Sequence, residues 1–514
     1  MFKNHPKGLL AASLSNMGER FGFYIMMASI VLFLMAKYDF SEATSNVVYS
    51  VLYGLIYALA LVGGIIADKT KKYKSTIQSG IILMSVGYLL IAIPTPTPVT
   101  NMPMSFGLTA FGLLCIAFGN GLFKGNLQAL VGQMYDNNEY SAKRDSGFSL
   151  FYMFINVGAI FAPLIATGLR SWLLKSNGFL YNAGLPERCH QFLNNKMSTE
   201  QVTEFKTLVA ENTVNSQLST DLAAFSTNYL NVFTTGYHYA YGVAIIAMLI
   251  SLVIYIINKK RFPDPALKKD VTSTEIKEEV QMSAQEIKQR LYALFAVFAV
   301  VFFFWLSFHQ NGASLTLFAK DYINMDNFKL PLGFVTLEGV ELFQSINPIF
   351  IVALTPIILG FFGWMRAKGK EPSTPKKIAI GMGIAALAYI VMIIGSMELP
   401  AASEVKEMAG GLPKAIQVSP FLLVLTYLVL SIAELFISPL GISFVSKVAP
   451  PKYQGLMQGC WLGTTAMANF LLWIGAALYS TTSLTATWLV FVGACFISMI
   501  LMFSMIKWLE RVAK

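Results

Sequence analysis

Charged residues are scarce in this sequence. Only 13% of the residues are Asp, Glu, Lys or Arg, which is about half the fraction found in a typical soluble domain, whereas 55% are hydrophobic. This imbalance excludes an ordinary soluble protein and predicts an integral membrane protein. The formal net charge of +10 is therefore no sign of a nucleic-acid partner. In a chain that crosses the membrane many times, an excess of Lys and Arg reports orientation instead.

Cysteine is also rare, and its placement excludes a disulfide framework. Cys115, Cys460 and Cys495 lie in apolar segments, and only Cys189 lies in a long polar loop. We therefore predict no disulfide. A cleavable signal peptide is not expected either, because the basic N-terminus leads into an apolar run that is too long for one. Metal-ligand spacings, nucleophile elbows and phosphate-binding loops are missing from the polar segments. This favours a protein that is not an enzyme and has no metal, catalytic residue or cofactor.

Long apolar runs are what the sequence does have. Windows of about 20 apolar residues, the length that crosses roughly 30 Å of hydrocarbon, recur twelve times. The predicted spans are 8–36, 46–67, 76–94, 104–133, 147–174, 236–258, 289–319, 346–366, 377–397, 418–447, 454–480 and 484–508. Lysine and arginine gather in every second loop, beginning with the loop after the second span. This pattern predicts a multi-pass protein of the cell inner (plasma) membrane with both termini in the cytoplasm.

Two polar insertions interrupt the spans. Residues 175–235 form an outer segment, and residues 259–288 form an inner linker in which 273–280 begins like a capped amphipathic helix. The linker divides the spans into six and six. We therefore predict an N-terminal bundle over 1–258, the linker, and a C-terminal bundle over 289–514. This plan predicts an all-α membrane protein with the major facilitator fold, twelve transmembrane helices and a solute site between the bundles.

Ionisable residues inside the spans are few, and they come from both halves. Glu19, Arg20 and Lys124 belong to the N-terminal half, whereas His309 and Glu434 belong to the C-terminal half. A charge within a membrane helix costs roughly 3 kcal/mol on insertion scales, so such residues usually serve a site or a pathway. Each of them alone could be structural, as an ion pair, a helix lock or a hydrogen-bonding histidine. As a set they suit a zwitterionic solute or a proton relay.

Four sequence blocks resemble the proton-dependent oligopeptide transporters, a branch of the major facilitator superfamily. Residues 16–24 are similar to the family's Glu-x-x-Glu-Arg-Phe-x-Tyr-Tyr motif, with Glu19, Arg20, Phe21 and Tyr24 in register. The other blocks are Gly64 to Asp68, Arg144 to Gly158 with its Phe-Tyr-x-x-Ile-Asn-x-Gly signature, and Gln344 to Pro348 together with Glu434 to Gly441. The resemblance covers roughly residues 7–260 and 290–505. It therefore extends over both predicted bundles.

The resemblance implies a symporter that imports di- and tripeptides with protons as the coupling ion, by alternating access. It implies that Arg20 and Lys124 hold the peptide carboxylate and that Glu434 faces the amino terminus. The remaining implied contacts are Asn156 and Asn347 to the peptide backbone and amino end, and Tyr24, Tyr57 and Trp461 as site walls. The resemblance implies that Glu19 belongs to a proton-linked cluster with Arg20, and we expect Glu434 to be proton-linked as well. We expect a monomer in the lipid bilayer, with peptides and protons as partners.

The departures from the family pattern are informative as well. Asn16 replaces the first glutamate of the motif, and Phe23 replaces its first tyrosine. Met27 and His309 stand where many members carry an arginine and its acidic partner. Because both charges are lost together, neither is left unpaired. His309 becomes a further candidate for proton coupling, since an imidazole titrates in the range of external pH. The linker is too short and polar for the two extra helices of many bacterial members.

Three alternatives stay open at this point. The altered motif allows another small solute, for example an anion or a peptide-like compound. Peptide transport without proton coupling is also compatible with the residues, in which case His309 is structural. A receptor or an enzyme built around 175–235 belongs to a different functional class, and deletion of that segment without effect on uptake would exclude it.

A contact between Lys124 and Glu434 is expected to close one gate when no peptide is bound.

Overall fold

The computed structural model describes residues 4–182, 185–214, 220–263, 282–312, 314–324, 330–331, 336–337, 342–407 and 412–513. The described chain is almost entirely helical. Eleven of its helices are long and apolar enough to cross a membrane. The predicted all-α membrane fold is therefore confirmed. All four cysteines are free.

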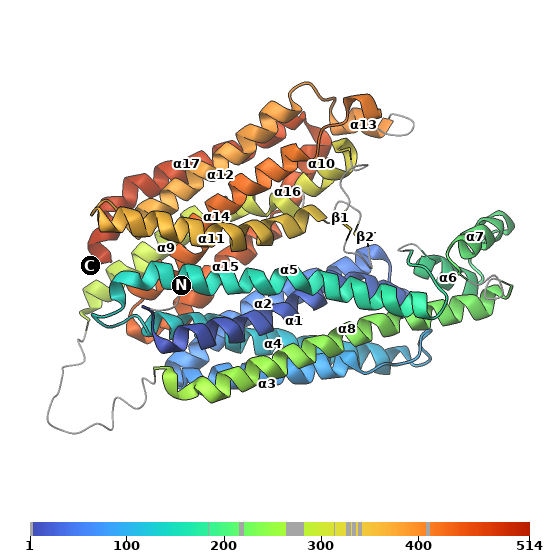
Figure 1. Cartoon of the computed structure of the whole chain (residues 1–514), viewed down its shortest axis with the longest axis horizontal. Coiled ribbons are helices and arrows are strands. Elements are labelled where there is room, and N and C mark those ends of the chain that lie inside the picture. Colours follow the sequence, from blue (N-terminus) through green and yellow to red (C-terminus); the bar gives the residue numbers. More distant parts are fainter. Residues whose placement is uncertain are drawn as a thin grey trace.

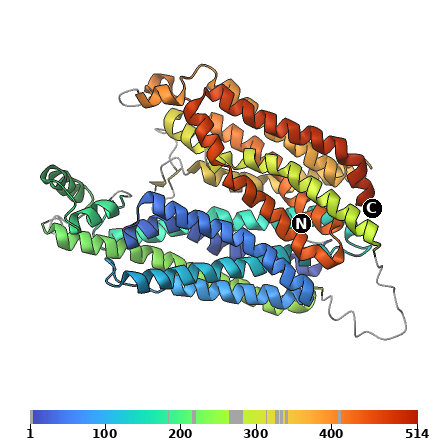
Figure 2. The same ribbon diagram turned by 180° about the vertical axis from the view of Figure 1, so that it is seen from behind.

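The long helices form two bundles that lie side by side (Figures 1 and 2). In the first bundle α3 packs along α4 and α1 packs between α5 and α8. In the second bundle α12 packs between α14 and α17, and α15 packs along α9. The first bundle consists of α1 (Lys7–Tyr38), α2 (Glu42–Thr70), α3 (Tyr73–Ala92), α4 (Met102–Gln133), α5 (Arg144–Ser176) and α8 (Leu222–Asn258). The second consists of α9 (Ala284–Phe308), α11 (Leu342–Ala367), α12 (Thr374–Ser396), α14 (Phe421–Val448), α15 (Gln454–Phe470), α16 (Trp473–Thr481) and α17 (Leu484–Val512).

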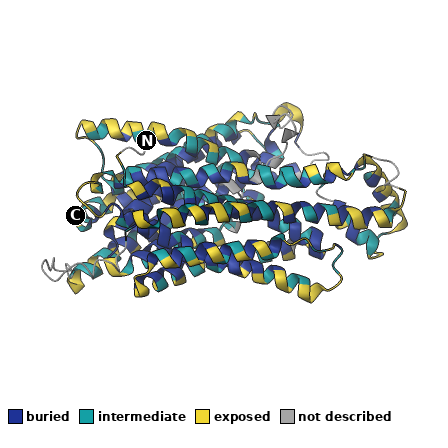
Figure 3. Ribbon diagram, turned by 60° about the horizontal axis from the view of Figure 1, so that its bottom comes forward, coloured by how far each residue is buried: buried dark blue, intermediate teal, exposed yellow. Residues whose placement is uncertain are grey.

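Both chain termini lie at one end of the molecule (Figure 1). We call this end, where α2, α4, α11 and α14 finish, the inner end, after the orientation predicted from the loop charges, and the opposite end the outer end. The flanks of the bundles expose large apolar side chains such as Ile257, Ile394 and Phe421, which are 73%, 68% and 78% exposed (Figure 3). Such a surface suits lipid rather than water.

Two of the predicted spans are broken. The span predicted over 289–319 ends as an α-helix at Phe308, continues as a short 3-10 helix (η5, His309–Gly312) and restarts as α10 (Ser314–Tyr322). The span predicted over 454–480 is divided at Leu471 and Leu472 into α15 and α16. Hydropathy alone missed both breaks, because the apolar character continues across them. The predicted span over 454–480 is thus made by two shorter helices, neither of which is among the eleven candidate membrane helices.

The outer insertion is shorter than predicted and contains helices of its own. Helix α8 begins at Leu222, well before the expected 236, because Asp221 caps it by accepting hydrogen bonds from two backbone amides. Between α5 and α8 lie α6 (Leu185–Leu193) and α7 (Thr199–Glu211). Helix α6 is anchored to the end of α1, where His190 Nε2 lies 2.8 Å from the Ala36 carbonyl oxygen.

Smaller elements complete the described chain. Strands β1 (Leu330–Pro331) and β2 (Thr336–Leu337) form an antiparallel pair. The short helices are η1 (Ser141–Lys143), η3 (Lys259–Arg261), α13 (Ala402–Glu407), η6 (Lys414–Ile416) and η7 (Pro451–Tyr453). The helix predicted over 273–280 lies outside the described residues. Helix α9 begins at Ala284 rather than 289, with Ser283 as its N-cap.

Candidate functional site

The first helix carries a buried ion pair near its middle. Arg20 donates two hydrogen bonds to Glu19, from Nε to Oε2 at 2.5 Å and from Nη2 to Oε1 at 2.6 Å. Asn120 of α4 adds a third bond, from Nδ2 to Glu19 Oε1 at 2.5 Å. Glu19 and Arg20 are 1% and 2% exposed. This two-point geometry neutralises the guanidinium within its own bundle.

Lys124 lies one turn beyond Asn120 on the same face of α4, as their spacing predicted. Its Nζ lies 5.1 Å from the ring centroid of Tyr57 on α2. Within the described chain it forms no salt bridge. The hydroxyl of Tyr53 lies 3.3 Å from that of Tyr57. Lys124 is therefore a cation supported by an aromatic face but not neutralised.

Glu434 on α14 is held by uncharged donors. Tyr152 of α5 donates a short hydrogen bond to Oε1, and Asn347 of α11 donates to Oε2 at 2.8 Å. Asn347 also reaches Ser431 Oγ at 3.0 Å. The Tyr152 bond joins the two bundles. The expected contact between Lys124 and Glu434 is not among the ion pairs of the described chain, because the carboxylate is satisfied by hydroxyl and amide donors instead.

The remaining predicted wall residues are closely packed. Asn156 Nδ2 donates to the carbonyl oxygen of Tyr152 in its own helix, at 3.2 Å. Trp461 is 2% exposed, and its ring packs against Gly441 and lies 6.2 Å from the ring of Phe298. Tyr24 meets Phe23 edge to face, with ring centroids 5.4 Å apart. None of these four contacts reaches across the bundles.

His309 lies apart from these residues, at the end of α9. Its ring stacks on Trp305 with centroids 4.9 Å apart. Asn469 of α15 is its polar neighbour. In the described chain His309 has no carboxylate partner. The structure thus joins Glu19 with Arg20 and Glu434 with Asn347, and it places His309 in a separate cluster.

Two aspartates of the first bundle bind the second bundle at the inner end. Asp68, at the end of α2, accepts backbone hydrogen bonds from Gly455 at 3.0 Å and Leu456 at 2.9 Å, at the start of α15. Asp145, at the start of α5, accepts from Thr374 Oγ1 at 2.8 Å in the first turn of α12. Each carboxylate therefore sits at a helix N-terminus, where a negative charge is stabilised.

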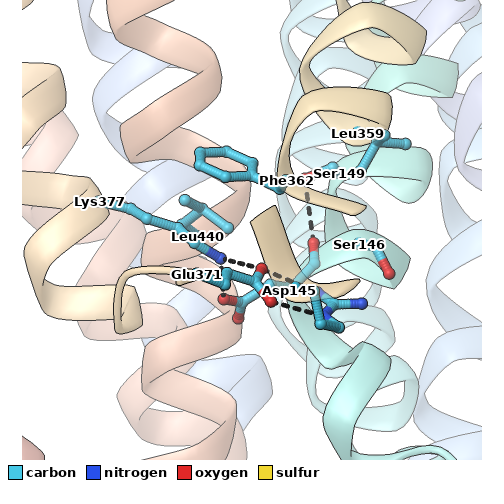
Figure 4. A pocket seen from close by; sticks show the side chains of 9 residues that line it. Asp145, Ser146, Ser149, Leu359, Phe362, Glu371, Lys377 and Leu440 are labelled. Atoms are coloured by element: carbon cyan, nitrogen blue, oxygen red, sulfur yellow. Dashed lines mark hydrogen bonds and ion pairs between the residues drawn. The ribbon is translucent and has the colours of Figure 1, made fainter. Parts of the chain in front are cut away.

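The contacts of Asp145 belong to a partly buried charge cluster, which Figure 4 shows. Lys377 Nζ lies 3.1 Å from Asp145 Oδ2 and 2.8 Å from Glu371 Oε1. Arg366 binds the other side of Glu371 at 2.5 Å. Burial alone would raise the pKa of Glu371, but hydrogen bonds from Arg366 and Lys377 hold it below its ordinary value of 4.5. The cluster ties α5 to the loop between α11 and α12.

Nearly all hydrogen bonds between the bundles in the described chain lie at this inner end. Gln133 binds Gln454 at 3.0 Å, and Arg144 Nη1 donates to Ser446 Oγ at 3.0 Å. The exception is the bond from Tyr152 to Glu434, farther along α5 and α14. Over the described residues the inner end is therefore closed.

Sequence reasoning missed several of these residues. Tyr152 lies four residues before Asn156 on the same helix, so helical spacing would have placed it near the predicted site. Asn120 was visible as one turn from Lys124, but its role as a partner of Glu19 was not. The charge cluster around Asp145 had no comparable signal. Arg366, Glu371 and Lys377 are close together in the sequence, but no pattern in it indicates that they meet Asp145 of the first bundle.

Comparisons with known proteins extend this picture. The chain matches the family model PTR2, described as the POT family, over residues 74–280 and 273–489. It is 29% identical over 480 residues to an uncharacterized transporter, YclF, of Bacillus subtilis, covering 91% of this chain and 87% of that protein. It is also 29% identical over 493 residues to the peptide transporter YePEPT of Yersinia enterocolitica, with the same two coverages.

A solved structure shares the fold. The crystal structure of a peptide transporter POT in complex with alafosfalin superposes with a TM-score of 0.59 at 21% identity, over 100% of this chain and 96% of that chain. The two-bundle arrangement is therefore an established transporter fold. The predicted major facilitator fold is confirmed on this ground.

Proposed function

The chain belongs to the POT family of transporters and is not an enzyme, and from this premise we propose that it imports di- and tripeptides together with protons by alternating access. Relatives named as peptide transporters, and as dipeptide and tripeptide permeases, support the solute class. The arrangement of charges in the two bundles supports the binding mode.

One observation carries the proposal: a cation and an anion that form no salt bridge within the described residues come from opposite bundles. Lys124 lies over the Tyr57 ring, and Glu434 is held by the neutral donors Tyr152 and Asn347. A peptide carries a carboxylate at one end and an ammonium group at the other. Binding the carboxylate near Lys124 and the ammonium near Glu434 would compensate both charges, and it would draw the two bundles together around the solute.

Proton coupling is proposed to use the buried acids. Glu19 of the first bundle and Glu434 of the second, which are 1% and 4% exposed, are the proposed proton-linked acids. His309 is the third proposed group; its ring stacks on Trp305, and it forms no salt bridge within the described residues. A membrane potential of 100 mV contributes about 2.3 kcal/mol per charge, which is roughly a fiftyfold accumulation.

Uptake by proteoliposomes tests the proposal. Labelled dialanine is offered with an inward pH gradient, without a gradient, and with a potential alone. We expect accumulation that depends on the gradient and that falls at least tenfold in Lys124→Ala. The control is Lys206→Ala, which removes an exposed lysine from α7 outside the bundles. Equal uptake with and without the gradient would refute proton coupling. Full uptake and affinity in Lys124→Ala would refute the proposed carboxylate site.

A further inference from the structure

Three tyrosines of α2 form a ladder along one face of the helix. Tyr49, Tyr53 and Tyr57 follow one another at intervals of four residues, and this spacing makes their side chains neighbours. The rings of Tyr49 and Tyr53 are stacked with centroids 6.0 Å apart, and those of Tyr53 and Tyr57 meet edge to face at 5.1 Å. Because α2 finishes at the inner end, the ladder runs from the outer side towards Tyr57, the ring over which Lys124 lies.

Tyr53 is the middle member of this ladder and has partners on two helices. Its hydroxyl lies 3.3 Å from the hydroxyl of Tyr57, so one of the two donates a hydrogen bond to the other. On α1, the ring of Phe23 lies 6.4 Å from the ring of Tyr53, with an angle of 33° between the planes. Phe23 is 4% exposed, and the Arg20 guanidinium lies 4.2 Å from its ring centroid. Tyr53 therefore lies between a buried ring of α1 and the ring that faces Lys124.

The Tyr57 ring helps to place the charge of Lys124. The Lys124 Nζ lies 5.1 Å from the ring centroid, and Lys124 forms no salt bridge within the described residues. A cation is attracted to the face of an aromatic ring within about 6 Å of its centroid, so a tilt of the ring weakens the contact. Tyr57 is 8% exposed, which leaves little room for water beside it. The orientation of this ring therefore bears on where the ammonium group stands.

We infer that Tyr53 is a positioning residue for the proposed carboxylate site. Its hydroxyl bonds the Tyr57 hydroxyl, this bond holds the Tyr57 ring, and the ring places the ammonium group of Lys124 that meets the solute carboxylate. Tyr53 acts through Tyr57 and needs no contact with the solute. The inference rests on the proposed peptide uptake and adds a residue that sets the affinity of that site. Packing of an aromatic stripe would be retained by phenylalanine, whereas the positioning role requires the hydroxyl.

Removal of the two hydroxyls singly and together tests the inference. Saturable dialanine uptake by proteoliposomes is measured for the wild-type protein, Tyr53→Phe, Tyr57→Phe and the double variant. We expect Tyr53→Phe to raise KM about two- to tenfold, the effect of losing one hydrogen bond, and to leave the maximal rate unchanged. The double variant should have the same KM as Tyr57→Phe, because the effects of residues that act through one another do not add. Tyr49→Phe is the matched control, since it removes a hydroxyl one turn farther out and leaves the bond between Tyr53 and Tyr57 in place.

Each outcome decides the question. An unchanged KM in Tyr53→Phe, or effects of Tyr53→Phe and Tyr57→Phe that add in the double variant, refutes the positioning role while uptake by the wild-type protein remains. A lower maximal rate at an unchanged KM, or an equal rise of KM in Tyr49→Phe, shows that the ladder serves packing and also refutes the role. If the wild-type protein takes up no dialanine, the proposed function itself fails, and the inference fails with it.

Discussion

Replacement of Gly64 by alanine is expected to open the inner end. Gly64 lies on α2, and a Cβ there would lie 2.5 Å from both the carbonyl carbon and the oxygen of Gly455 on α15. These are backbone atoms of the other bundle, so they cannot move aside without moving α15. The substitution removes no hydrogen bond and adds one methyl group. We therefore expect it to oppose the close approach of the two bundles and to have little other effect on the fold.

The size of the effect follows from the overlap. Inserting a methyl group into a packed contact costs about 1–3 kcal/mol. Because the contact exists only when the inner end is closed, this cost falls on the closed state alone and shifts the ratio of closed to open molecules by about 5- to 150-fold. The nearby bonds from Gly455 and Leu456 to Asp68 are expected to weaken with it.

Pulsed electron paramagnetic resonance in lipid nanodiscs measures this shift. Spin labels at Lys71 and Lys452, which are exposed at the inner end on opposite bundles, report the separation. Gly64→Ala is expected to move the population towards longer distances. Gly125→Ala is the matched control, since it adds a methyl group at the same junction between bundles, where the nearest atom is 3.6 Å away.

Two results would overturn this reasoning. An unchanged distance distribution in Gly64→Ala, with the melting temperature also unchanged, would mean that the backbone contact does not limit closure. A shift of equal size in Gly125→Ala would mean that any added methyl group at this interface acts alike. A lower melting temperature without a longer distance between the spin labels would indicate that the substitution disturbs packing within the first bundle.

Two further predictions concern the charge cluster at the inner end. Asp145→Asn removes the charge that Lys377 meets across the bundles, and the same spin-label pair should show a larger open population, at a cost of about 1–3 kcal/mol to the closed state. An unaltered distance would contradict this role. The lowered pKa of Glu371 means that its ion pairs persist above its ordinary value of 4.5 and are lost only as the pH falls below the lowered pKa. Titration of Glu371 should therefore leave closure unchanged between about pH 5 and 8, and stronger acid should open the inner end less in Glu371→Gln than in the wild-type protein.

The helical architecture followed from the sequence because hydropathy reports it directly. The spacing of Asn120 and Lys124 placed both on one helix face, and the structure confirms that face. The breaks after Phe308 and Phe470 were not predictable in the same way. The chain stays apolar through both, and the breaks coincide with a tertiary contact, the Gln310 side chain packed against Gly475. A pattern within one segment cannot contain that information.

The charged residues were predicted as a set, but their partners were not. Glu434 was expected to meet Lys124 and instead accepts hydrogen bonds from Tyr152 and Asn347. Which donor a buried carboxylate takes depends on how the bundles are tilted, and that tilt is set by many weak contacts along α2, α5, α11 and α15. Sequence reasoning identifies the titratable groups, whereas the conformation selects their partners.

Arg20 and Lys124 have different partners, and this difference limits the ways in which the site can bind a zwitterionic solute. Arg20 is bound at two points by Glu19, so a solute carboxylate reaches the guanidinium only by competing with an acid already in place. Lys124 offers its charge without such competition. On the opposite bundle, an incoming ammonium group must share Glu434 with Tyr152, whose bond joins the bundles. The ammonium group of the solute and the Tyr152 hydroxyl therefore both bind the same carboxylate. This shared partner couples occupancy of the site to the relative position of the bundles.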